Sequence, residues 1–126
     1  MENSSMTSNS QPVILMFGND STLSYLFGRF AERGGYRLAI NAENLSTREI
    51  EVVNPVAIIF LSTELLERAQ ALVMELVGLE APIMVCSSVV DEVKARELGA
   101  DFCLLHPITY DGFQEALASA IATKRA

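Results

Sequence analysis

The chain has 126 residues, half of them hydrophobic, and sixteen acidic against nine basic residues give it a net charge of −7. This length fits one domain with one core. The negative charge repels phosphate backbones and anionic lipid, so neither nucleic acid nor a membrane surface is expected as a partner. Its mean hydropathy of +0.28 is high, but no apolar run approaches the roughly 20 residues that span a bilayer. The apolar excess is therefore expected in the core or at an interface.

The ends of the chain and its two cysteines suggest a reduced, intracellular protein. Residues 1–11 are rich in Ser, Asn and Thr without periodic apolar positions, which predicts a disordered tail. The domain is expected over residues 12–123, followed by a C-terminal tail at 124–126. No basic segment precedes an apolar core near the start, so a cytoplasmic location is predicted. Cys86 and Cys103 lie in apolar runs and are expected as buried thiols, with a regulatory disulfide as the minor alternative.

The domain is expected to open with a strand, a helix and a second strand. Residues 13–17 form an apolar run typical of a buried parallel strand. Asp20 or Ser21 can cap a helix whose apolar residues recur at helical spacing, and the glycines at 34–35 end it. Residues 36–40 predict the second strand.

The middle of the chain predicts a short helix, a strand and a longer helix. Ser46 and Glu49 fit a capping box that begins a helix reaching about residue 53. Residues 56–61 form the next apolar run, and a third helix is predicted over about 64–77. Its apolar stripe consists of Leu65, Ala69, Leu72 and Leu76, widened by Leu66, Val73 and Val77. The stripe is interpreted as core, with the three widening residues as an alternative partner surface.

Two more strand and helix pairs are expected at the end. Residues 83–87 and 102–105 predict strands. The fourth helix is marked by Val90, Val93 and Leu98 and stopped by Gly99, and the fifth is marked by Phe113, Leu117, Ala120 and Ile121. Five strand–helix units in series predict an α/β fold with a parallel sheet and helices on both faces.

The segments at the carboxyl ends of the strands carry a resemblance to a known family. Residues 99–108 read Gly-Ala-Asp, a strand, then His-Pro, which resembles the Gly-Ala-Asp, strand, Lys-Pro-aromatic pattern of response regulator receiver domains in two-component signalling. Residues 82–88 are similar to that family's fourth strand, with its terminal Ser or Thr. Over residues 12–122 the resemblance implies a doubly wound, flavodoxin-like fold with five parallel strands in the order 2-1-3-4-5.

The resemblance also places the family's functional positions on residues of another chemistry. The phosphoacceptor aspartate falls on Leu61, and the two magnesium-binding acids fall on Gly18 and Asn19. The lysine that senses the phosphoryl group falls on His106, and the aromatic switch residue falls on Cys103. Only two positions match, with Asp20 as the third acid and Ser87 as the hydroxyl. The resemblance thus implies a pseudo-receiver, which keeps the fold and a regulatory role without phosphotransfer.

The same edge offers residues for other kinds of site. Ser87, His106 and Asp20 are the residue types of a hydrolase triad, but no G-x-S-x-G elbow or Gly-rich oxyanion loop accompanies them. The turn at 18–20 has one glycine, short of a phosphate-binding loop. If the register were shifted by one, Ser62 would replace Leu61 in the pocket, again without a carboxylate. One histidine and one acid at this rim predict no metal, and no cofactor is expected.

The predicted function is a cytoplasmic, non-catalytic receiver-like module that acts through protein contacts without phosphorylation. Its partner face is expected at the fourth helix, fifth strand and fifth helix, through Arg96, Glu97 and Cys103, because the resemblance implies this region as the usual docking face. The charges on that helix are interpreted as a solvated face. The partner is expected to be a signalling protein, and homodimerisation stays open. The alternative is a flavodoxin-like module that binds a small ligand or nucleotide.

Overall fold

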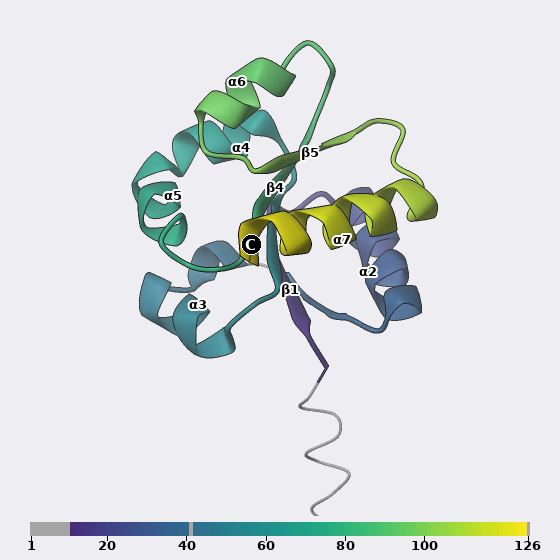
Figure 1. The fold of residues 1–126 in the computed structure, drawn as a ribbon, viewed down its shortest axis with the longest axis horizontal. Helices are drawn as coiled ribbons and strands as arrows, with labels where there is room; N and C mark the ends of the chain where they lie inside the picture. Colours follow the sequence, from purple (N-terminus) through teal and green to yellow (C-terminus); the bar gives the residue numbers. More distant parts are fainter. Residues whose placement is uncertain (1–10, 41, 126) are drawn as a thin grey trace, which may run out of the picture.

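The computed structural model describes residues 11–40 and 42–125, so residues 1–10 of the predicted tail and residue 126 lie outside the described residues. Its centre is a parallel sheet of five strands in the order β2-β1-β3-β4-β5, which confirms the predicted order (Figure 1). The strands are β1 (Val13–Phe17), β2 (Arg37–Ala39), β3 (Ala57–Phe60), β4 (Ile83–Ser87) and β5 (Phe102–Leu105).

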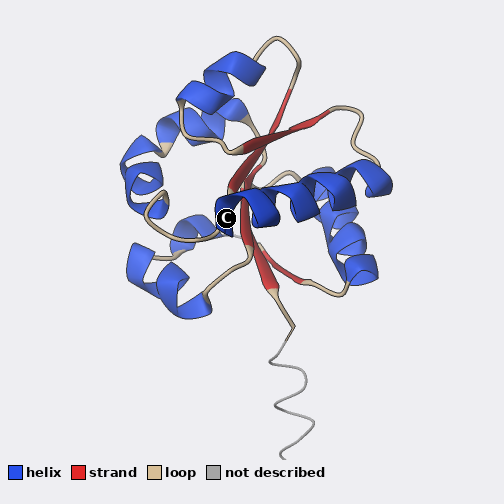
Figure 2. Cartoon of the chain, in the orientation of Figure 1, coloured by secondary structure: helices blue, strands red, loops and turns tan. Residues whose placement is uncertain are grey.

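Helices cover both faces of the sheet (Figure 2). They are α2 (Ser21–Gly34), α3 (Thr47–Val53), α4 (Thr63–Arg68), α5 (Gln70–Leu76), α6 (Glu92–Glu97) and α7 (Tyr110–Arg125), with a 3-10 turn, η1 (Ala42–Asn44). Buried side chains of α2 and α7 pack on one face, and those of α3, α4, α5 and α6 pack on the other. Helix α7 continues through Arg125, beyond residue 123, where the sequence analysis ends the domain.

The central strands are buried along their whole length because both of their faces are covered. All five residues of β1 and all four of β3 are buried, which explains why their sequences are continuous apolar runs rather than alternating ones. Phe17 and Phe60, the last residues of these two strands, are paired in register and stack with ring centroids 4.5 Å apart. A stacked pair of aromatic rings therefore lies at the carboxyl ends of β1 and β3.

The predicted helix ends of the first half are confirmed. The Asp20 side chain accepts a hydrogen bond from the Leu23 amide, and Gly35 adopts a left-handed conformation after α2. Ser46 and Glu49 form the reciprocal capping box at α3. Each cap satisfies amide groups that the first turn of a helix leaves without a partner.

The third predicted helix is two helices, because the chain breaks at Ala69. Its φ and ψ of −103° and 25° end α4 and precede α5. The Gln70 side chain donates to the carbonyl of Leu66 at 3.0 Å and to that of Leu98 at 2.9 Å, which ties the break to the end of α6. Leu66 and Val73 are buried, so these two residues do not form the alternative partner surface suggested by the sequence.

The fourth helix differs from its prediction in both length and orientation. Helix α6 spans Glu92–Glu97, and its buried residue is Ala95. Val90 precedes the helix and is 88% exposed, while Val93 is 69% exposed. The apolar spacing predicts that Val90 and Val93 face the sheet. Instead, the small Ala95 is buried, and both valines are exposed to solvent.

Candidate functional site

Gly18 and Leu61 meet at the carboxyl edge of the sheet, where β1 and β3 end. A Cβ atom added to Gly18 would lie 2.8–2.9 Å from the Leu61 side chain, and the φ of Gly18 is +125°. Both features require glycine, because the left-handed backbone disfavours a side chain and Leu61 occupies the space. Leu61 is 6% exposed and belongs to the core cluster on the α2 and α7 face.

Ser62 has a separate task beside Leu61. Its hydroxyl accepts a hydrogen bond from the Leu65 amide at 3.1 Å and so caps α4. The Leu61 side chain occupies the space beside Gly18, while the assignment of the phosphoacceptor position to Leu61 rather than Ser62 stays a prediction. An apolar side chain therefore closes this corner of the edge.

The other polar residues predicted for the site lie around that corner. Asn19 and Asp20 are exposed in the turn after β1, and the Asp20 carboxylate is engaged in capping α2. Ser87 is 5% exposed, and its hydroxyl has no hydrogen-bond partner among the described residues. His106 is exposed and is followed by a cis peptide bond to Pro107. No hydrogen bond joins Ser87, His106 and Asp20, so the structure does not assemble the hydrolase triad that the sequence analysis argued against.

Two adjoining hollows open beside the Gly18 turn. The first, of about 220 Å³, is lined by Phe17, Gly18, Glu43, Phe60, Leu65, Arg68 and Ala69. The second, of about 460 Å³, is lined by Gly18, Asn19, Asp20, Leu23, Glu43, Leu61, Ser62, Leu65 and Arg68. They share four residues, so together they form one crevice with an apolar part and a polar part.

Sequence reasoning missed Glu43 and Arg68, the two charged residues that both hollows share. Glu43 lies on η1, after β2, and Arg68 lies at the end of α4. The Glu43 carboxylate accepts a long hydrogen bond of 3.5 Å from the Gly18 amide. Neither residue belongs to a sequence motif, because only the fold brings the two connections together.

Metal binding finds no support in the side chains present. Within residues 11–40 and 42–125, no group of three or more His, Cys, Asp or Glu side chains could hold an ion. Gly18, Asn19 and Leu61 supply no carboxylate at the corner, and Mg²⁺ sites use at least one or two.

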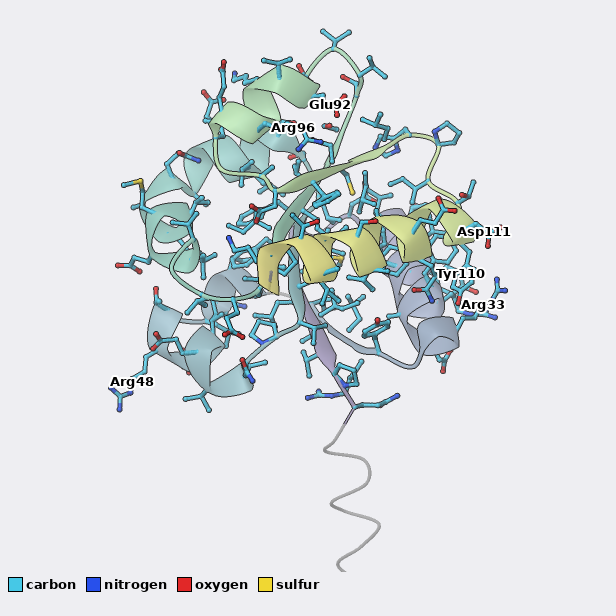
Figure 3. The ribbon with its side chains drawn as sticks, viewed as in Figure 1. Arg33, Arg48, Glu92, Arg96, Tyr110 and Asp111 are labelled. Carbon is cyan, nitrogen blue, oxygen red and sulfur yellow. The ribbon has the colours of Figure 1, made fainter. Side chains whose placement is uncertain are left out.

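The predicted partner face lies where β5 runs between α6 and α7 (Figure 1). Glu97 is exposed, and Cys103 is half-buried. Arg96 is held in place, since its guanidinium donates to the Asp101 carbonyl at 2.9 Å and pairs with Glu92 at 3.3 Å (Figure 3). Arg96 is therefore part of the fold of this face as well as of its surface.

Exposed apolar residues are the feature of this face that the sequence analysis did not identify. Val89, Val90 and Val93 are 71%, 88% and 69% exposed, and Leu105, which pairs with Ser87 at the nearby end of β5, is 36% exposed. Three neighbouring exposed valines are a recognisable signal of a contact surface once the sheet-facing residue of α6 is known. We call Val89, Val90, Val93 and Leu105 the valine patch.

The two cysteines are separated by the sheet. Cys86 packs with the cluster under α2 and α7, and Cys103 packs against the cluster on the opposite face. Both are free thiols, and burial raises the pKa of Cys86 to about 12. Cys86 is thus held as an inert, neutral thiol, and the predicted disulfide alternative does not fit this geometry.

The comparisons with known proteins identify the fold. No family model and no curated protein matches the chain. Among solved structures, the receiver domain of a sensor histidine kinase from Pseudomonas aeruginosa, with magnesium in its active-site cleft, matches with a TM-score of 0.70 at 17% identity, covering 90% of this chain and 99% of that one. The receiver domain of a modulated diguanylate cyclase from Desulfovibrio desulfuricans matches with a TM-score of 0.66 at 18% identity, covering 92% and 98%. A CheY-like receiver domain protein from Methanospirillum hungatei matches with a TM-score of 0.63 at 18% identity, covering 92% of this chain and 98% of that one. The chain therefore has the fold of response regulator receiver domains.

Proposed function

We propose that this domain is a non-enzymatic, receiver-like signalling module of the cytoplasm, which acts by binding a protein partner and does not accept a phosphoryl group. The observation that carries the proposal is Leu61, 6% exposed at the carboxyl end of β3 and packed against Gly18. The fold brings phosphotransfer chemistry to this corner in proteins that have carboxylates there. An aliphatic side chain has no nucleophilic atom to attack a phosphoryl group and no oxygen to bind a metal.

The valine patch supports protein contact as the output. Burying a valine side chain gains roughly 1.5–3 kcal/mol relative to leaving it in water, so three valines exposed by 69–88% on one loop and helix are unfavourable in the free domain. The surrounding charges of Glu92, Arg96 and Glu97 provide a polar rim. An apolar centre with a polar rim is the usual composition of a protein interface. We propose that the partner is a signalling protein and that it docks constitutively.

Partner capture with matched valine variants tests this proposal. The full chain is immobilised and exposed to a lysate of the organism that encodes it, with and without acetyl phosphate, and bound proteins are identified by mass spectrometry. Val93→Glu should remove the specific partner, because it places a charge in the patch. Val52→Glu is the control, since Val52 is 79% exposed on α3 and should leave capture unchanged.

Both variants should retain the melting temperature of the parent chain, since surface substitutions usually change stability by less than about 0.5 kcal/mol. Acetyl phosphate should not alter the amount of partner bound. Capture that requires acetyl phosphate, or capture that Val93→Glu leaves intact, would contradict the proposal.

A further inference from the structure

The crevice beside Gly18 lies at the point where the chain changes sides of the sheet. Strand β1 has β2 on one side and β3 on the other, and α2 and α4, which follow β1 and β3, pack on opposite faces. The connections after β1 and β3 therefore diverge and leave an opening at the carboxyl ends of these strands. Open α/β sheets bind ligands at this kind of position.

The floor of the smaller hollow is apolar and rigid. It is made by the stacked rings of Phe17 and Phe60, with Leu65 and Ala69 from α4 and its end. Its volume of about 220 Å³ is below the roughly 300–1,000 Å³ of pockets that hold drug-sized molecules. This hollow is suited to a single aliphatic or small aromatic group.

The rim of the hollow carries opposite charges that form no ion pair within the described part of the chain. Glu43 and Arg68 line both hollows, and neither forms an ion pair with another residue of the described chain. Asp20 adds a second carboxylate in the larger, polar hollow. A guanidinium binds a carboxylate well, and a carboxylate binds an ammonium group, so the rim fits a ligand that carries both charges.

Nucleotides fit this crevice poorly. Two carboxylates and one guanidinium leave a net negative charge, which repels phosphate groups. The rings of Phe17 and Phe60 are 3% and 0% exposed and stack on each other, so they offer no free face for a base. The ligand is therefore expected to be small and to have one apolar end.

We propose that this crevice binds a free α-amino acid with an apolar side chain. The side chain enters the hollow over Phe17 and Phe60, the carboxylate pairs with Arg68, and the ammonium group pairs with Glu43. Binding would add a small-molecule input at the edge where relatives of this fold are phosphorylated. It uses neither the valine patch nor α6, so it stands or fails separately from partner docking.

The probe for this site is amide NMR of the full chain titrated with L-leucine, L-methionine and L-phenylalanine. We expect saturable shifts at the Gly18, Leu65 and Ala69 amides with a Kd of about 1 mM or tighter. Two leucine analogues separate the charges. The compound 4-methylpentanoate lacks the ammonium group and 3-methylbutylamine lacks the carboxylate, and each should bind at least about tenfold more weakly.

Matched variants locate the contacts. Arg68→Gln and Glu43→Gln should each weaken leucine binding by about tenfold or more. Arg48→Gln and Glu115→Gln make the same chemical changes at exposed positions outside the crevice, and Arg48 points away from the domain (Figure 3). These two controls should bind leucine as the parent does. The proposal is overturned if none of the three amino acids shifts the crevice amides at about 10 mM, if binding survives Arg68→Gln unchanged, or if the amine analogue binds as tightly as leucine.

Discussion

Leu61 and Gly18 are in such close contact that the choice of residue at one position restricts the choice at the other. Leu61 lies so close to Gly18 that any side chain at position 18 would overlap with it. A carboxylate introduced at either position alone should therefore disturb the packing.

Leu61→Asp is expected to destabilise the domain by about 2–4 kcal/mol at neutral pH, through lost burial and an unpaired charge. Leu61→Asn has the shape of the Asp variant without its charge, so it should lose less stability than Leu61→Asp. Burial raises the pKa of the new carboxyl in the folded state, so its penalty appears above the unfolded pKa near 3.9 and grows as the pH rises to the folded value. Urea unfolding at about pH 4 and pH 7 measures the difference. Equal stabilities of the Asp variant and the parent at pH 7 would show that Leu61 is not buried.

Gly18→Ala tests the contact itself, with Gly35→Ala as its control. Both glycines have positive φ, but an added Cβ at Gly35 meets nothing within 4 Å. Gly35→Ala should therefore lose about 1 kcal/mol of stability from backbone strain, and Gly18→Ala should lose at least about 1 kcal/mol more from the overlap.

In a double-mutant cycle, Leu61→Ala removes the overlaps of the Leu61 Cγ and Cδ1 atoms with the methyl group added by Gly18→Ala but keeps the Cβ contact at 2.9 Å. It should therefore recover part of the stability that Gly18→Ala loses to overlap, with a coupling energy of about 0.5–3 kcal/mol. Strictly additive free energies of unfolding would mean that the two side chains do not touch.

Single residues were predictable where local spacing fixes them. Leu61 follows from the distance to Pro55 and Pro82, and the cap at Asp20 follows from the residue type. Glu43 and Arg68 were not predictable, because they come from separate connections and meet only when η1 and α4 converge. Long-range proximity of this kind leaves no periodic trace in one sequence.

At the scale of elements, the sequence predicted where helices occur. It did not predict the break within the third helix or which side of the fourth helix faces the sheet. The apolar spacing of 64–77 suits one helix, but Ala69 breaks it and Gln70 bonds two carbonyl groups at the break. Helical periodicity reports which residues are apolar and not whether the hydrogen-bond ladder is continuous. For the fourth helix, the pattern was set by Val90, Val93 and Leu98, although the buried residue of α6 is Ala95.

The Gly-Ala-Asp segment shows why some motifs predict structure reliably. Gly99 has a φ of +113°, and a Cβ there would lie 2.8 Å from Val73. Ala100 is buried, and the Asp101 carboxylate accepts from the Ile83 amide at 2.8 Å, which joins the starts of β4 and β5. The motif is thus a structural clasp between neighbouring strands, so it identifies the fold without identifying the chemistry.

At the scale of the whole molecule, the series of strand–helix units predicts a parallel sheet covered on both faces, whereas the strand order was predicted from the resemblance of residues 82–88 and 99–108 to receiver domains. The function of the site was less predictable, because it depends on the side chains at the edge rather than on the strand order. The fold and the chemistry of the edge are separate properties of the chain.

The domain is expected to keep one conformation whether or not phosphoryl donors or their analogues are present. Acetyl phosphate with magnesium should produce no gain in intact mass, and beryllofluoride with magnesium should leave the amide spectrum unchanged, because Leu61, Gly18 and Asn19 offer neither nucleophile nor metal ligands. Under the proposed function, Cys103 and His106 have no phosphoryl group to respond to. Amides of α6 and β5 should show no more exchange than the rest of the domain in relaxation-dispersion measurements.

A receiver domain that retains its aspartate serves as the positive control. A hydroxylamine-labile gain of one phosphoryl group, or beryllofluoride shifts confined to residues 87–106, would contradict this expectation and restore phosphorylation as the input.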